Sequence, residues 1–196
     1  YKFDFSKFTR FINICKKNGV KYFEMAHLFS QWGSTSAPNI MVTENGKTDY
    51  MFGWHVAADS EEYREFLRQY IAAVSAELSA LGISENTYFH VSDEPSKEHI
   101  PYYKAAKESI SDLLEGYTIM DALSSYEFYT QGIVDTPIPC NDHVKPFIEG
   151  NVPNLWTYYC SSQWKDVSNR FLAMPSYRNR SIGMQMYKFD IVGFLN

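Results

Sequence analysis

The regular alternation of helix-like and strand-like segments is the feature that most constrains the fold of this chain. Apolar residues recur at helical spacing in several stretches, and short runs rich in aromatic and β-branched residues lie between them. The repeating units are roughly 30 to 40 residues long, which predicts parallel strands joined by right-handed crossovers. Asp59 and Glu62 are predicted to form a capping box at the start of one helix. Strands are expected at 20–29, 88–92, 117–123, 133–140 and 154–162 and from Gly193, and helices at about 5–18, 59–81, 96–115, 126–132, 142–149 and from 175.

An α/β barrel and a doubly wound α/β sheet both satisfy this order of elements. No glycine-rich phosphate loop follows any expected strand, which disfavours a nucleotide-binding sheet. Five strands and the beginning of a sixth are too few to close a barrel of eight, so a barrel here would be incomplete. The segment 38–54 is predicted to be an inserted β-hairpin, because Asn45-Gly46 is a strong turn signal. Since no repeat or linker is found, residues 1–196 are expected to form a single domain.

Composition and charge argue against several classes of function. With 196 residues, of which 45% are hydrophobic and 17% aromatic, the chain can bury a substantial core. The net charge of -5 argues against a nucleic-acid partner. The sequence contains no run of 18 apolar residues, which argues against insertion into a membrane. Cys15, Cys140 and Cys160 are widely separated, lack zinc-ligand spacing and are expected to be buried free thiols. Free thiols permit a cytoplasmic location.

The segment from Tyr88 to Pro95 carries the strongest signal for chemistry. A strand pattern runs into two adjacent carboxylates, Asp93 and Glu94, and stops at a proline. Two neighbouring carboxylates repel each other when ionised, so the pKa of one should be raised. A protonated carboxyl beside a carboxylate is the equipment of glycosidic-bond cleavage. The alternative is that Asp-Glu-Pro marks the first turn of a helix, where acidic residues and proline are both favoured.

Other polar and aromatic side chains follow the expected strands. Because the carboxyl ends of parallel strands meet at one edge, groups placed there should face a common ligand. Asp93, Asp121 and Trp156 are expected to open onto one cleft. The residues at strand carboxyl ends are Trp32, Glu94, Asp121, Asn141 and Trp164.

Three separated motifs resemble the catalytic domain of glycoside hydrolase family 123 and its uncharacterised bacterial relatives. They are His-Val-Ser-Asp-Glu-Pro at 90–95, Leu-Trp-Thr-Tyr-Tyr-Cys at 155–160, and Asn-Arg-Phe-Leu-Ala-Met-Pro-Ser-Tyr-Arg-Asn-Arg at 169–180 followed by the segment 183–195. The resemblance spans nearly the whole chain. It implies a (β/α)8 TIM-type barrel, incomplete here because the first strands and the end of the last strand are missing. A neighbouring β-sandwich domain, absent from this chain, is also implied. The resemblance to bacterial glycan degraders permits a secreted or periplasmic location beside the cytoplasmic one.

The resemblance further implies removal of terminal β-linked N-acetylgalactosamine by substrate-assisted retention. In this mechanism the 2-acetamido oxygen of the sugar attacks the anomeric carbon and gives an oxazolinium ion. Asp93 would orient and stabilise the acetamido nitrogen, and Glu94 would act as general acid and base. Adjacency suits this division of work, because a protein nucleophile and an acid that flank one bond need about 5 Å between them.

Further residues are candidates for binding the sugar. Trp32, Trp156 and Trp164 are predicted to stack on a pyranose ring, although a strand tryptophan also suits a core. Tyr158 is predicted to hydrogen-bond the acetamido oxygen. His27, His55 and Asn141 are candidates for contacts to sugar hydroxyls, and Asp121 is included among the substrate-binding residues. Arg170, Arg178 and Arg180 receive no catalytic role, because they suit structural ties around a loop.

The leading hypothesis is therefore a retaining β-N-acetylhexosaminidase that acts on an oligosaccharide or glycoconjugate without a metal or other cofactor. A carbohydrate-binding relative that has lost turnover is the alternative from another class. A glycosidase for a different sugar is a third possibility, since discrimination between galacto and gluco epimers depends on one or two hydrogen bonds.

Overall fold

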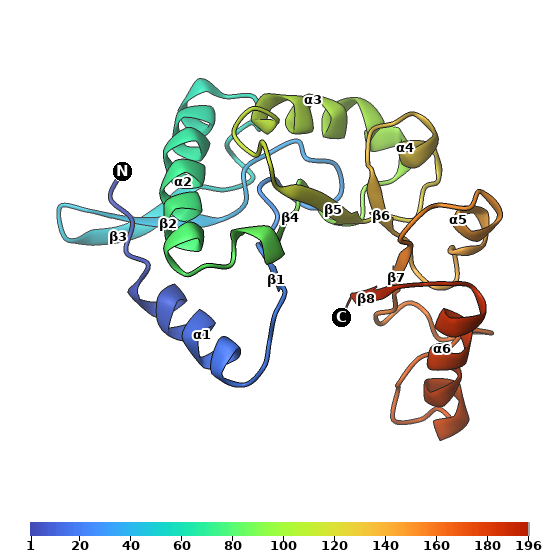
Figure 1. The fold of residues 1–196 in the computed structure, drawn as a ribbon. Helices are drawn as coiled ribbons and strands as arrows, with labels where there is room; N and C mark the ends of the chain where they lie inside the picture. The colour runs from blue at the N-terminus through green and yellow to red at the C-terminus, as the bar shows by residue number, and fades with distance from the viewer. Residues whose placement is uncertain (196) are drawn as a thin grey trace.

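Short parallel strands form the centre of the structure and helices connect them (Figure 1). The computed structural model describes residues 1–195. The expected parallel α/β architecture is confirmed, but the strands are shorter than predicted; the strand expected at 88–92, for example, covers 87–89. In chain order the elements are α1 (Ser6–Lys17), β1 (Phe23–Glu24), β2 (Ile40–Glu44), β3 (Lys47–Phe52), α2 (Glu61–Ala80), η1 (Ser84–Asn86), β4 (Thr87–Phe89), η2 (Lys97–His99), α3 (Ile100–Ile110), β5 (Thr118–Ala122), α4 (Glu127–Thr130), β6 (Thr136–Ile138), α5 (Lys145–Glu149), β7 (Trp156–Tyr158), α6 (Ser176–Lys188) and β8 (Gly193–Leu195).

The parallel strands are neighbours in space in the order in which they occur in the chain. β1, β4, β5 and β6 form one sheet, and β7 pairs with β8 in another. A parallel bridge between Cys140 and Tyr158 connects the end of β6 to β7. In Figure 1 these strands follow an arc, with α2, α3, α4 and α5 along its outer side. This sequential order is that of a singly wound sheet, because a doubly wound sheet reverses direction at a switch point.

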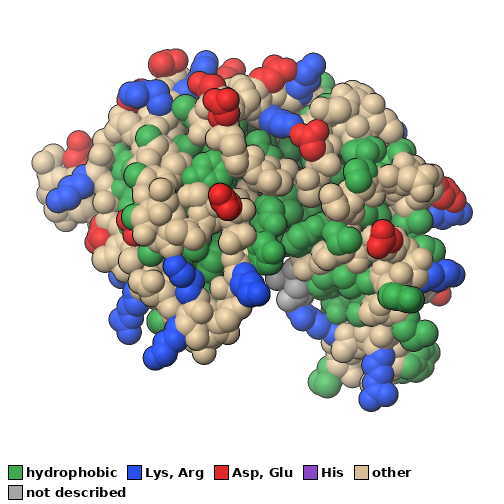
Figure 2. Space-filling model, viewed as in Figure 1, with side chains coloured by type: hydrophobic (Ala, Val, Ile, Leu, Met, Phe, Trp, Pro, Cys, Tyr) green, Lys and Arg blue, Asp and Glu red, His purple; other side chains and the backbone are tan. Residues whose placement is uncertain are grey.

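The two faces of the sheet pack in two separate apolar clusters. Phe89, Val91 and Leu123 belong to the large core that also contains the buried faces of α2 and α3. Met120 and Ala122, which alternate with the outward residues of β5, belong to a smaller cluster on the opposite, inner face. Figure 2 shows hydrophobic side chains gathered at the centre of this view, above a notch between the α1 end and the α6 end of the molecule. The inner cluster consists of Met120, Ala122, Ile138, Cys140 and Tyr158, with Tyr88, Trp156 and Leu195 partly buried against it.

The hairpin predicted at 38–54 is confirmed as β2 and β3. Asn45 and Gly46 both have positive φ, 50° and 79°, which suits the tight turn between antiparallel strands. A bridge between Ser36 and Ala57 closes the base of this insertion, and the side chain of Phe52 is fully buried there. The hairpin is therefore anchored to the body of the molecule next to the loop that follows β1.

The structure contradicts one predicted helix cap and the alternative interpretation of Asp93-Glu94-Pro95 as a helix start. Ser60 rather than Asp59 caps α2, because its backbone is extended and its Oγ accepts a hydrogen bond from the Tyr63 amide at 3.4 Å. Asp93 and Glu94 do not start a helix, since Ser96 precedes η2 and α3 begins at Ile100. The two adjacent carboxylates thus lie in a loop at the end of β4. Within residues 1–195 no helix is long and apolar enough to cross a bilayer.

Candidate active site

The loop that carries Asp93 and Glu94, residues 90–94, is held by main-chain hydrogen bonds from both neighbouring strands. The amides of Leu28, Phe29 and Trp32, which follow β1, donate to the carbonyls of residues 90, 91 and 93 at 3.0, 2.9 and 2.9 Å. On the other side, the Glu94 amide donates to the Ala122 carbonyl at 2.9 Å. The position of the two carboxylates is therefore fixed by the sheet although they lie outside a strand. We call this segment the catalytic loop, after the two candidate catalytic residues that it carries.

Asp121 fills a gap in the pairing between β4 and β5. The strand ladder pairs Phe89 with Ile119 and resumes only at the Glu94 amide. Between these points the Asp121 carboxylate accepts hydrogen bonds from the amides of Val91 at 3.1 Å and Ser92 at 3.3 Å. The prediction that Asp121 opens onto a cleft is wrong, because its side chain is 0% exposed. The physical reason is strand alternation, since its two neighbours on β5 occupy the inner face.

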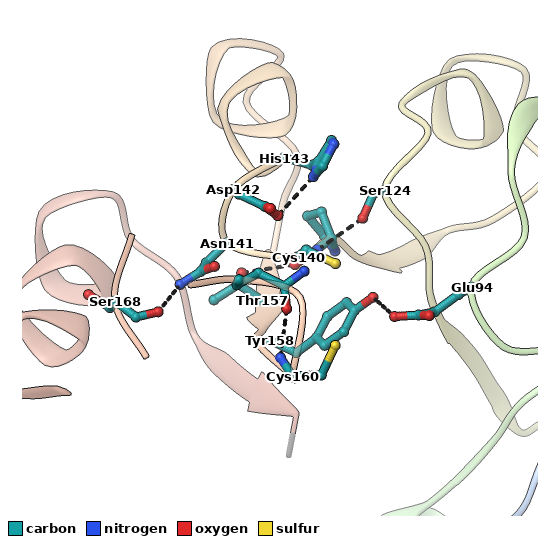
Figure 3. A network of polar contacts seen from close by, with 12 residues as sticks. Glu94, Ser124, Cys140, Asn141, Asp142, His143, Thr157, Tyr158, Cys160 and Ser168 are labelled. Atoms are coloured by element: carbon teal, nitrogen blue, oxygen red, sulfur yellow. Dashed lines mark hydrogen bonds and ion pairs between the residues drawn. The ribbon is translucent and has the colours of Figure 1, made fainter. Parts of the chain in front are cut away.

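Glu94 is exposed and reaches across the inner face to Tyr158 on β7. The Tyr158 hydroxyl donates to Glu94 Oε1 at 2.5 Å, as Figure 3 shows. Glu94 has a φ of 46°, a left-handed conformation that is unusual for a residue with a side chain and costs on the order of 1 kcal/mol. Two motifs that are separate in the sequence, 90–95 and 155–160, therefore meet at one carboxylate.

Asp93 is partly buried beside Glu94. Burial raises the pKa of the Asp93 carboxyl, and the charge of Glu94 raises it further, while His27 and His90 oppose the shift. A raised pKa on one member of the pair was expected from the sequence. The two adjacent carboxyls consequently differ in environment, with Asp93 partly desolvated and Glu94 open to solvent.

Two exposed tryptophans stand next to the catalytic loop. Trp32 and Trp54 are 56% and 61% exposed, and their rings meet edge to face with centroids 6.4 Å apart. The amide of Trp32 is the one that donates to the Asp93 carbonyl. Trp54 was not predicted from the sequence as a binding residue. Its position at the end of the second strand of the inserted hairpin is the signal that could have identified it. Exposed indole faces of this kind suit the apolar face of a sugar ring.

The other two predicted tryptophans differ in setting. Trp156 is half-buried, with its ring directly over Gly193 and edge-on to Tyr88 at 6.1 Å. Trp164 is 62% exposed in the loop after β7. Arg178 donates to the carbonyls of Trp164 and Val167 at 3.2 and 3.0 Å, and thus ties this loop to α6. Arg178 accordingly has the structural role that the sequence suggested.

The remaining predicted binding residues lie on the two sides of the loop. Asn141 donates through Nδ2 to the Ser168 carbonyl at 2.7 Å, as Figure 3 shows, and its buried Oδ1 has no hydrogen-bond partner among residues 1–195. His27 is half-buried and its charge acts on Asp93, whereas His55 is exposed after β3. Of the cysteines only Cys140 is buried; Cys15 is half-buried and Cys160 is exposed, so the expectation of three buried thiols is wrong.

The described residues, 1–195, contain no group of three or more His, Cys, Asp or Glu side chains that could hold a metal ion. The arrangement supplies two carboxyls in different environments, a phenol donor and exposed indole rings. Chemically it can donate and accept a proton next to a sugar that stacks on an aromatic surface.

Comparison with known proteins agrees with this chemistry. The sequence model described as "Glycoside hydrolase 123, catalytic domain" matches residues 1–196. Among solved structures, a family 123 glycoside hydrolase from Clostridium perfringens, described in a study of glycolipid glycan hydrolysis, superimposes with a TM-score of 0.74 at 14% sequence identity. The match covers 100% of this chain and 35% of that one, so the chain spans about a third of its structural neighbour. No match was found among curated proteins.

Proposed function

The chain belongs to glycoside hydrolase family 123, and on that premise we propose that it contributes the catalytic part of a retaining β-N-acetylhexosaminidase. The observation that carries the proposal is the hydrogen bond between Tyr158 and Glu94, which joins two distant motifs at one carboxylate. An exposed carboxyl held by a phenol beside a second, partly buried carboxyl is suited to proton transfer at a sugar.

The two carboxyls take different roles in the proposed reaction. The 2-acetamido oxygen attacks the anomeric carbon while Glu94 gives its proton to the departing glycosidic oxygen. The ring of the resulting oxazolinium ion carries positive charge next to Asp93, which favours the ionised form of Asp93 despite its raised pKa. Glu94, now ionised, removes a proton from the water that opens the oxazolinium ring and restores the β configuration.

Substrate contacts are proposed from the groups around the catalytic loop. Trp32 and Trp164 provide exposed indole faces, and the Asn141 amide has an acceptor without a partner within the described chain. His27 lies close enough to act electrostatically on Asp93 and is proposed to contact a sugar hydroxyl. Trp156 belongs to the floor of the site, where it packs on Gly193. Tyr158 is proposed to pass its hydrogen bond from Glu94 to the acetamido oxygen when the sugar binds.

N-acetylgalactosamine is the proposed sugar, at the end of an oligosaccharide or glycoconjugate. Because the study of the Clostridium perfringens neighbour concerns glycolipid glycans, we propose these as the first class of substrate to test. No metal or nucleotide is assigned a role.

We further propose that residues 1–196 form one domain and are most of a (β/α)8 barrel. The sequential order of parallel strands, the arc in Figure 1 and the separate inner cluster all support a barrel wall with part of its circumference missing. A β-sandwich domain is proposed to pack beside the barrel in the whole protein.

The test is a set of aryl β-N-acetylhexosaminides, galacto and gluco, with good and poor leaving groups, assayed on the full-length protein. If Glu94 is the acid, Glu94→Gln should slow substrates with poor leaving groups by about 10²- to 10⁴-fold and activated aryl glycosides far less. Asp93→Asn should slow all leaving groups alike, because it weakens stabilisation of the oxazolinium-like transition state.

The alternatives make different predictions in the same assay. A binding protein would show no turnover of any substrate while still binding the sugar. An enzyme for another sugar would turn over neither epimer but would cleave other glycosides with the same dependence on Glu94. Equal losses on activated and unactivated substrates for Glu94→Gln would exclude the acid/base role.

A further inference from the structure

A buried polar cluster lies directly behind the catalytic loop and has no part in the proposed bond cleavage. Its centre is Asp121, whose two oxygens accept three hydrogen bonds and form an ion pair with the His90 ring. Oδ2 accepts from the Val91 amide and the Tyr103 hydroxyl, and Oδ1 accepts from the Ser92 amide and lies 3.4 Å from His90 Nδ1. A carboxylate offers about four acceptor positions, so these three hydrogen bonds and the ion pair with His90 surround it with partners.

The carboxylate of Asp121 replaces main-chain acceptors in the sheet. Between the Phe89–Ile119 pair and the Glu94–Ala122 hydrogen bond, the segment that follows β4 has more residues than the facing part of β5, so the β5 carbonyls cannot reach every amide of that segment. Each buried amide must find an acceptor, because an unsatisfied one costs the free energy of its lost hydration. The side chain of Asp121 supplies these acceptors immediately before the two catalytic carboxyls.

His90 holds Asp121 from one side and carries a positive charge. Its ring lies between two carboxylates, with Nδ1 3.4 Å from Asp121 Oδ1 and Nε2 3.3 Å from Glu24 Oε2. Burial disfavours the charged ring, but the contacts with both carboxylates outweigh burial and raise the pKa of His90 to about 9. His90 is therefore an imidazolium at neutral pH, and its charge lowers the pKa of Asp93.

We propose that Asp121 and His90 are positioning residues for the Asp93–Glu94 pair. Asp121 fixes the main chain of the catalytic loop, while His90 fixes Asp121 and supplies the positive charge that helps Asp93 to ionise. This inference rests on the proposed glycosidase function, but its structural part is testable without turnover. The charged groups that act on Asp93 are Glu94, His27, Asp121 and His90, and those that act on His90 are Asp121 and Glu24.

The first test replaces Asp121 with asparagine in the full-length protein. The amide NH2 of asparagine would face donors where the carboxylate has an acceptor, so at least one buried donor loses its partner. We expect kcat to fall about a hundredfold with KM changed less than about threefold, since small displacements of catalytic groups cost this much. Hydrogen exchange in a peptide covering 88–94 should accelerate, because the amides of Val91 and Ser92 lose their acceptor.

Thr87→Val is the matched control for a general loss of stability. Thr87 is 2% exposed on β4, at the end of the strand away from the catalytic loop, and its hydroxyl donates to the Ile83 carbonyl at 2.8 Å. Its loss removes a buried hydrogen bond from the same strand without touching Asp121. We expect kcat to stay within about threefold of wild type even where the melting temperature falls.

The second test uses His90→Gln and measures the pH dependence of kcat/KM. Loss of a positive charge raises the pKa of Asp93, so the acid limb should move to higher pH, whereas damage to the fold alone would lower the whole profile without moving it. In the wild type, ¹³C-labelled histidine followed by NMR should show His90 titrating with a midpoint of about 9.

The outcomes separate this inference from the proposed function. Wild-type kcat and unchanged exchange at 88–94 in Asp121→Asn would overturn the role of Asp121. A His90 midpoint near the ordinary value of about 6.5, with an acid limb that does not move in His90→Gln, would overturn the role of His90. If the wild type turns over no glycoside, the proposed function fails, whereas accelerated exchange in Asp121→Asn and a high His90 midpoint would still support the anchoring.

Discussion

Replacement of Tyr158 by phenylalanine tests the contact with Glu94 on which the proposed active site depends. The mutation removes one hydroxyl, which donates to Glu94 Oε1 at 2.5 Å, and leaves the ring in the inner cluster. Glu94 is otherwise exposed, so without this bond its carboxyl is free to leave the position from which it protonates the glycosidic oxygen. We expect a loss in kcat/KM with little change in fold.

The size of the loss follows from the chemistry of the bond. Glu94 becomes charged as it gives up its proton in the transition state, and a hydrogen bond to a charged group contributes about 1.5 to 3 kcal/mol. About 1.4 kcal/mol corresponds to a factor of ten in rate. Tyr158→Phe should therefore lower kcat/KM on an aryl β-N-acetylhexosaminide by about 10- to 150-fold. Tyr159→Phe is the matched control, because Tyr159 is also 7% exposed but its hydroxyl contacts Asn179, at 3.4 Å and away from Glu94.

Steady-state kinetics on both variants decides between the two proposed partners of the phenol. If the bond serves Glu94, the loss is largest for poor leaving groups, as for Glu94→Gln. If the bond passes to the acetamido oxygen, the loss is the same for all leaving groups. Activity of Tyr158→Phe equal to that of Tyr159→Phe would refute the reasoning that this contact is catalytic.

Three further predictions concern binding, packing and stability. Trp54→Ala should raise KM for an oligosaccharide several-fold and leave KM for an aryl monosaccharide unchanged, because the exposed indole is expected to contact sugar units beyond the terminal one. Equal effects on the KM of both substrates would contradict this. Gly193→Ala should lower the free energy of unfolding, measured by urea denaturation, by about 1 to 3 kcal/mol, because the added Cβ would lie 2.0 Å from the Trp156 ring. Gly183→Ala, in open space on α6, is the control and should be neutral or stabilising; similar effects of the two changes would exclude the packing argument. Asp93→Asn should raise the melting temperature at neutral pH. Because the pKa of Asp93 is raised in the folded state, the folded protein binds the proton more tightly than the unfolded chain, and the stability present at low pH is lost as the pH rises through the unfolded and folded pKa values; a variant without the charge avoids this loss. An unchanged melting curve would count against burial of the charge.

Local patterns in the sequence were sufficient for the elements whose structure depends on local chemistry. The buried side of α2 contains Tyr63, Phe66 and Leu67, which recur at helical spacing, and Asn45-Gly46 forms the predicted turn. The parallel order of strands also followed from element order, because a helix between two strands leaves them pointing the same way.

The details of the site could not be derived in this way, because they depend on contacts between distant segments. Asp121 follows the alternation of β5 and so points to the core. Its role depends on a gap in strand pairing after β4, and no sequence pattern predicts that gap. The approach of Trp54 to Trp32 requires the base of the hairpin to close through Ser36 and Ala57. The left-handed backbone of Glu94 likewise occurs at a residue whose amide binds a distant segment, at the Ala122 carbonyl.

The sequential order of the strands has a consequence for how the site forms during synthesis. Parallel neighbours that follow one another in the chain can pair as soon as each emerges, and contacts between near segments form quickly. The catalytic loop needs two segments that are synthesised later, because its amides bind Asp121 and the proposed acid, Glu94, binds Tyr158. A nascent chain that has passed the catalytic loop but not β7 would therefore hold both carboxyls without a phenol to orient Glu94. The proposed active site would be complete only when Tyr158 has left the ribosome and packed against the inner cluster.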